Sequence, residues 1–274
     1  GLDASSEDFF HGGDLAGLME KLPYIEELGV TSIWITPIFK NEPVSVDGQS
    51  GAYHGYWIND FYQVDPHLGT NKELKKFIKE AHKRDMKVFF DIVTNHTADV
   101  IRYEECHNPD GSFPEGQYGC PYIDKSQPAY TPFIPEGKEN VKNPEWLNDP
   151  SYYHNRGDSP FDGGEAQLHG DFYGLDDLAT QDPFVIQGMI DIFEFWVSEF
   201  RIDGFRLDTV KDVHIEFWQE FAPAMREHAE SEGIDDFFIF GEAFDSRQSL
   251  LSRYTREGEL DSVLDFDLNL AIVD

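Results

Sequence analysis

The chain has 274 residues, of which 40% are hydrophobic and 15% aromatic, so it can bury a large core and is not a disordered polymer. Its 53 acidic residues against 21 basic ones give a net charge of −32, which argues against nucleic acid and membrane surfaces as partners because both are anionic. It contains no apolar run long enough to predict a membrane-spanning helix.

The cysteines and the N-terminus bear on the compartment. Cys106 and Cys120 lack the spacing of a zinc site and lie in a loop-rich stretch, where both a disulfide and two free thiols are possible. The first ten residues show no charged stretch followed by an apolar one, so no signal peptide is visible in them. A mature exported chain would show the same. We expect a secreted protein.

A helix followed by a strand is the first predicted pair of elements. Asp14 can cap a helix that Pro23 breaks or restarts and that Gly29 ends. Residues 30–39 are rich in β-branched and aromatic side chains, which indicates a buried strand.

The same pair of elements then recurs. Thr70 and Glu73 form a capping box, and the apolar residues after it recur at helical spacing: Leu74, Phe77, Ile78 and Ala81. Residues 87–93 predict a second buried strand. This alternation favours a parallel sheet with crossover helices.

Residues 98–170 interrupt the alternation. They hold 9 of the 15 prolines and both cysteines, together with many Gly, Asn and Asp residues. Because so long a loop inside a compact domain is usually functional, we interpret this stretch as an inserted subdomain. The predicted division is therefore 1–97 for the first part of the main domain, 98–170 for the insert and 171–274 for the continued main domain.

The alternation resumes after the insert. Asp182 and Pro183 begin a long helix, residues 200–210 form a strand, and residues 214–232 form another helix. Residues 237–244 form a strand that ends in a carboxylate, and residues 262–270 start one more. Five strand units are thus visible, whereas a complete (β/α)8 barrel needs eight. The fold class we predict is α/β, a partial TIM barrel without its first strand and its last two.

Two carboxylates stand out without any reference to a family. Asp208 and Glu242 each end an apolar strand, and neighbouring parallel strands lie about 4.8 Å apart, so the two carboxylates would be about 5 Å apart. That is the spacing of a retaining glycoside hydrolase. A structural alternative is that Asp208 only pairs with Arg206, two residues away on the same strand face.

Further polar residues follow the strand ends. His96 could bond a hydroxylated ligand, although a single histidine is more often structural. Asn95, Asp171 and Asp177 offer the hard oxygen atoms that calcium prefers, but their spacing matches no contiguous calcium loop.

Four segments in this order, residues 91–96, 174–178, 204–211 and 240–244, together with a YHGYW stretch before them, resemble the conserved regions of the α-amylase family, glycoside hydrolase family 13. The resemblance covers essentially the whole chain. It implies a (β/α)8 barrel with an inserted domain B after the third barrel strand.

By position, the resemblance implies that Asp208 is the nucleophile, Glu242 the general acid/base, and Arg206 the residue that orients Asp208. It implies that Tyr56 and His96 line the subsite of the attacked sugar and that Lys211 reaches a sugar on the leaving-group side. The implied calcium ligands are Asn95, Asp177, the likeliest insert-side residue Asp171, and the main-chain carbonyl of Asp212, where the family often has His.

The function we expect is retaining hydrolysis of internal α-1,4 bonds in starch and maltodextrins, with calcium as cofactor and an α-glucan as partner. A cyclodextrin- or maltodextrin-specific hydrolase, a sugar transferase or isomerase, and a non-catalytic glucan-binding fragment are the alternatives. The third family carboxylate, after the seventh strand, has no counterpart in these residues. We therefore expect these residues to act only together with the remainder of the barrel, in a longer chain or a second fragment.

Overall fold

A computed structural model describes residues 6–45 and 48–273, so part of the N-terminal stretch searched for a leader lies outside it. In the described residues the central sheet has five parallel strands in the order β1-β4-β9-β10-β11. Their bounds are Ser32–Ile35 (β1), Lys87–Ile92 (β4), Gly204–Leu207 (β9), Phe238–Gly241 (β10) and Ser262–Val263 (β11). Each predicted strand unit therefore contributes one strand, and spatial order follows chain order, as in a β/α barrel.

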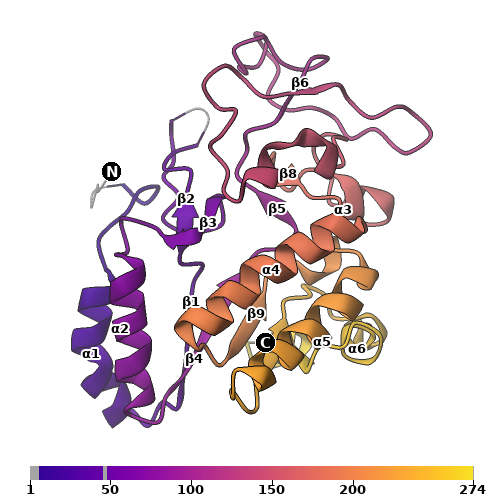
Figure 1. Cartoon of the computed structure of the whole chain (residues 1–274). Helices are drawn as coiled ribbons and strands as arrows, with labels where there is room; N and C mark the ends of the chain where they lie inside the picture. Colours follow the sequence, from indigo (N-terminus) through magenta and orange to yellow (C-terminus); the bar gives the residue numbers. More distant parts are fainter. Residues whose placement is uncertain (1–5, 46–47, 274) are drawn as a thin grey trace.

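One helix precedes the first of these strands and one helix follows each strand, and several of these helices cover one side of the sheet (Figure 1). They are α1 (Leu15–Glu27), α2 (Asn71–His82), α4 (Pro183–Phe200), α5 (Ile215–Ser231), α6 (Gln248–Arg256) and α7 (Phe266–Val273). The longest, α4, is apolar over most of its surface because it packs against β3, α2 and α5. Its Trp196 is fully buried and donates from Nε1 to the carbonyl oxygen of Phe61 at 2.7 Å. None of the helices within the described ranges is both long and apolar enough to cross a membrane.

The predicted caps are present. Asp14 accepts a hydrogen bond from the amide of Gly17 at 2.7 Å, and Asp182 accepts one from Phe184 at 2.7 Å. The predicted break at Pro23 is wrong, because α1 runs through it to Glu27. A proline there removes one main-chain hydrogen bond, while buried Leu15 and Leu22 on either side keep the helix packed on the core.

A two-stranded antiparallel ribbon was not predicted. It joins β2 (Phe39–Asn41) to β3 (Ile58–Val64), and the pairing is irregular, so no simple alternation marks it in the sequence. At the other end of the chain, the strand expected over 262–270 is short: β11 ends at Val263 and α7 begins at Phe266. The alternating apolar residues of that stretch belong mostly to a helix.

Residues 98–170 contain little regular structure and form the lobe above the sheet in Figure 1. The elements in and around this lobe are β5 (His96–Thr97), β6 (Arg102–Tyr103), β7 (Pro132–Phe133), the 3-10 helices η1 (Glu145–Asn148) and η2 (Pro150–Tyr152), α3 (Glu165–His169), β8 (Asp176–Asp177) and the 3-10 helix η3 (Val210–Asp212). We call residues 98–170 the insert; its boundaries stay a prediction. Cys106 and Cys120 are both buried in it as free thiols.

Gly204 tests the packing of the sheet. A Cβ at this position would overlap the carbonyl oxygen of Phe238 and the ring of Phe89 on the two neighbouring strands. We expect Gly204→Ala to lower the free energy of unfolding of the full-length protein by about 3 kcal/mol or more, the upper range of overpacking. Denaturant unfolding measures it. Gly17→Ala, in α1, is the matched control and should be neutral or stabilising; equal effects of the two variants would contradict the described register.

Candidate active site

The polar ends of three adjacent strands meet at one edge of the sheet. Asp91 lies in β4, Arg206 lies in β9 directly opposite it, and Asp208 follows β9. Glu242 follows β10, whose Gly241 is paired with Leu207. In a β/α barrel this carboxyl edge is where active sites lie.

The guanidinium of Arg206 joins these carboxylates. One terminal nitrogen, Nη1, donates to Oδ1 of Asp91 and to Oδ1 of Asp208, each at 2.7 Å. The other, Nη2, lies 2.8 Å from Oε2 of Glu242. Asp208 and Glu242 are therefore held at the two ends of one planar cation, so the structural alternative of a simple Asp208–Arg206 pair does not describe the whole arrangement.

Burial controls the protonation of this cluster. It raises the pKa of Asp208 to about 8; Asp91 and Glu242 act in the same direction, and the Arg206 guanidinium opposes it. Burial likewise raises the pKa of Asp91 to about 6, again opposed by Arg206. Burial alone would lower the pKa of Arg206, but the carboxylates of Asp91 and Asp208 raise it instead. The guanidinium stays charged and is the main influence that favours ionised carboxylates here.

Two residues of this cluster had no role in the sequence analysis. Asp91 belongs to one of the four segments that resemble the α-amylase family. Its contact with Arg206, however, becomes evident only from the pairing of the two neighbouring strands. Its Oδ2 accepts hydrogen bonds from Nε1 of Trp34 and from the hydroxyl of Tyr56, each at 3.1 Å. The ring of Trp34 also faces the guanidinium, 5.3 Å from its central carbon. The buried-strand pattern of residues 30–39 gave no sign that Trp34 is 47% exposed at the site.

The remaining predicted substrate residues lie around the same edge. Tyr56 is half-buried and reaches the cluster through Asp91. His96 is buried and stacks on Phe172 with 5.5 Å between ring centroids, and its Nε2 has no partner among the described residues. Lys211 and Glu242 line one cavity of about 620 Å³, with Phe172 in its wall.

The residues predicted to hold calcium also converge. His96 pairs with Asp177 in the β5–β8 ladder, which places Asn95 beside Asp177. Oδ1 of Asn95 and Oδ1 of Asp177 are buried without hydrogen-bond partners in the described structure. Asp171 accepts a hydrogen bond from the amide of Asp177 at 3.4 Å.

The charges around these oxygens are uncompensated. Burial raises the pKa of Asp177 well above its usual range, and repulsion from Asp212 adds to the rise. Burial also raises the pKa of Asp171, with a further contribution from Asp177. Buried carboxylates and an unsatisfied amide oxygen are the donor set that a hard divalent cation takes, so these residues fit such an ion.

Comparison with known proteins decides the family. The profile of the alpha-amylase catalytic domain matches residues 3–274. The chain belongs to the alpha-amylase family. This confirms the resemblance seen in the sequence, and with the parallel sheet it confirms a partial (β/α)8 barrel.

Individual relatives span the α-amylase family. The chain is 50% identical to an alpha-amylase of Streptomyces lividans, over 97% of this chain and 31% of that protein. It is 31% identical to the cyclomaltodextrin glucanotransferase of Klebsiella oxytoca, over 86% of this chain and 32% of that protein. The crystal structure of the Geobacillus thermoleovorans alpha-amylase complexed with acarbose matches with a TM-score of 0.73 and 36% identity, over 98% of this chain and 49% of that one. The chain thus spans about a third to a half of these relatives.

Proposed function

We propose that the protein carrying this chain is a retaining α-glucan hydrolase of the α-amylase type, acting on internal α-1,4 bonds of starch and maltodextrins. The observation that supports this most is the guanidinium of Arg206, which holds two carboxylates on adjacent strand ends. The family and the 50% identity to an alpha-amylase support the same activity. The α-glucan substrate and the secreted location are parts of this proposal.

The proposed reaction has two steps. Asp208 attacks the anomeric carbon and forms a glycosyl ester while the bond to the leaving oxygen breaks and Glu242 gives that oxygen its proton. Water then attacks the same carbon, its proton returns to Glu242, and the carboxylate of Asp208 is released. Arg206 favours the ionised form of Asp208 against the effect of burial and positions its carboxylate, and Asp91 with Trp34 and Tyr56 holds Arg206 in place.

The catalytic pair gives the most direct test. In the full-length protein, Asp208→Asn removes the nucleophile and Glu242→Gln removes the acid, so each should lower kcat on starch by several orders of magnitude with the fold unchanged. Glu199→Gln makes the same chemical change at an exposed position on α4 and serves as control. Activity above a tenth of wild type in either site variant would overturn the assignment, and a glucan-binding role without catalysis would then be favoured.

A transferase is the second candidate because of the similarity to the cyclomaltodextrin glucanotransferase. The two differ in what attacks the glycosyl ester: water in a hydrolase, and a sugar hydroxyl in a transferase. Product analysis separates them, since linear oligosaccharides indicate hydrolysis and cyclic products indicate transfer.

The pH profile tests the role of Arg206. A protonated Asp208 cannot attack, so kcat/KM should fall as the pH drops through the raised pKa of Asp208. Arg206→Lys keeps the positive charge but loses the planar contacts that favour ionised Asp208, so it should move the acidic limb to higher pH as well as slow the reaction. Arg201→Lys, at the exposed C-terminus of α4, should leave the profile unchanged. An acidic limb that stays in place or moves down in Arg206→Lys would contradict this role.

We further propose that Asn95, Asp171, Asp177 and the main-chain carbonyl of Asp212 hold one calcium ion between insert and barrel. The unpartnered oxygens of Asn95 and Asp177 support the proposal, because burial of such groups is costly unless they are satisfied. When bound, the ion would supply positive charge for these carboxylates and fix the insert against the barrel.

Removal of the metal tests this site. A calcium chelator should lower the Tm of the full-length protein, and Asp177→Asn should largely abolish the difference between the calcium-loaded and calcium-free Tm. Asp110→Asn, an exposed change elsewhere in the insert, should keep it. A Tm that is unaffected by the chelator would refute the calcium site without affecting the assignment of Asp208 and Glu242.

A further inference from the structure

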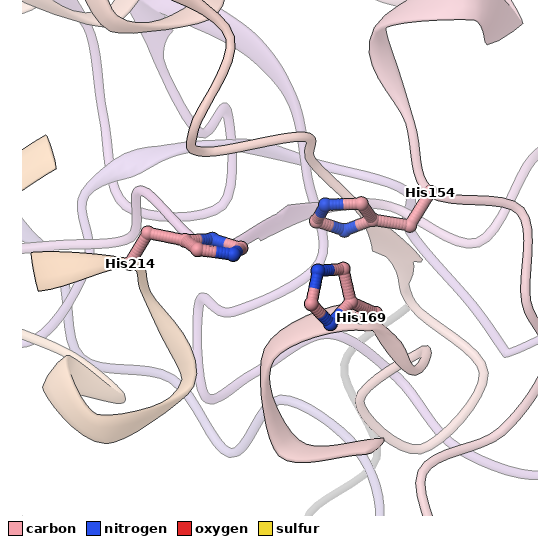
Figure 2. A group of neighbouring side chains, drawn as sticks. All are labelled: His154, His169 and His214. Carbon is pink, nitrogen blue, oxygen red and sulfur yellow. The ribbon is translucent and has the colours of Figure 1, made fainter. Parts of the chain in front are cut away.

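Three histidines far apart in the sequence come together beside the insert. His154 lies in the loop after η2, His169 ends α3, and His214 precedes α5 of the barrel. One ring nitrogen of each lies within 4.8 Å of those of the other two. The three rings point toward one another (Figure 2).

Each ring has a nitrogen fixed by an oxygen atom outside the trio. Nδ1 of His169 bonds the main-chain oxygen of Glu165 at 2.9 Å, and Nδ1 of His214 bonds the hydroxyl of Thr180 at 2.9 Å. Nδ1 of His154 lies 2.5 Å from Oδ2 of Asp177. Such contacts set the tautomer and orientation of a histidine that binds a metal through its other nitrogen; in His154 that other nitrogen already bonds the amide oxygen of Gln181.

His169 shows most clearly that hydrogen bonds alone do not satisfy the ring nitrogens of the three histidines. Its side chain is buried, with 3% exposure, and its Nε2 has no partner among the described residues. Because a carbonyl oxygen accepts the Nδ1 proton, this buried Nε2 carries a lone pair and needs a donor or an electrophile.

We propose that His154, His169 and His214 form a binding site for a transition-metal ion, with Zn²⁺ the ion best suited to it. Three imidazoles and one open position are a common zinc ligand set, whereas calcium prefers oxygen. With Zn–N bonds of about 2.0–2.1 Å, tetrahedral ligands lie about 3.3 Å apart, so the rings need to move together by about 1 Å or somewhat more. The amide oxygen of Gln181, 2.8 Å from Nε2 of His154, must yield or supply a fourth ligand.

The site would connect two parts of the chain. His154 and His169 belong to the insert and His214 to the barrel, so an ion bound by all three cross-links them. It is distinct from the proposed calcium site, because its ligands are nitrogen atoms, but it adjoins that site through the contact between His154 and Asp177. We therefore expect the ion to stabilise the protein and to leave the chemistry at Asp208 and Glu242 in place.

The test uses the full-length protein with calcium in excess, titrated with Co²⁺ as a spectroscopic substitute for Zn²⁺. We expect one Co²⁺ per chain, with the intense visible bands of tetrahedral nitrogen ligation, its displacement by Zn²⁺, and a higher Tm with Zn²⁺. His169→Gln and His214→Gln should each weaken Zn²⁺ binding by more than about 100-fold, the upper cost of losing a supporting partner of a metal ligand.

A histidine within α5 provides the control. His228, in α5, bonds the hydroxyl of Ser198 away from the trio, so His228→Gln should bind Zn²⁺ as the wild type does. His214 is only partly buried, so His214→Gln remains informative if His169→Gln does not fold. Absence of the visible bands in the wild type, or binding that survives both substitutions in folded protein, would overturn the proposal. Neither result would bear on the calcium site or on hydrolysis.

Discussion

The contact of one guanidinium with three carboxylates is the interaction on which the candidate active site depends. Arg206 is buried and can be charged there only because Asp91, Asp208 and Glu242 surround it. The carboxylates in turn need Arg206, since burial alone would keep Asp208 and Asp91 protonated. The register of the parallel sheet fixes this mutual dependence, because a shift of β9 by one residue would turn Arg206 to the opposite face.

A second group of buried charges lies where the insert meets the barrel. Asp177 is its centre: it pairs with β5, contacts His154 and lies among other carboxylates, and no cation side chain neutralises it in the described residues. For the adjacent carboxylate the insert does supply a cation, since the ammonium of Lys142 contacts Asp176. The two neighbouring aspartates thus differ in how their charge is balanced, and this difference separates an internal salt bridge from a candidate metal site.

The sequence predicted the five strands of the central sheet, the helix caps and the meeting of Asp208 with Glu242 at one edge because these depend on local patterns. Apolar runs mark the strands, and the carboxyl ends of parallel strands must lie at one edge. Contacts that depend on register or on the path of an irregular loop were not predictable in this way. The sequence pattern predicts Trp34 as a core residue, and its place at the site follows only from the pairing of β1 with β4. The three histidines are too far apart in the sequence to form a metal-binding motif.

The insert has little regular structure, so its position depends on buried polar contacts more than on main-chain ladders. This matters for the proposed substrate cleft, because Phe172, just after the insert, both lines the cavity shared by Lys211 and Glu242 and stacks on His96. Phe172 directly follows Asp171, whose carboxylate belongs to the proposed calcium site and accepts a hydrogen bond from Tyr103 at 2.6 Å. A calcium ion that neutralised Asp171 and Asp177 would therefore hold Phe172, one wall of the proposed cleft, in place. With the proposed calcium site, metal binding and substrate binding would be coupled through the position of this single loop, without any metal contact to the sugar.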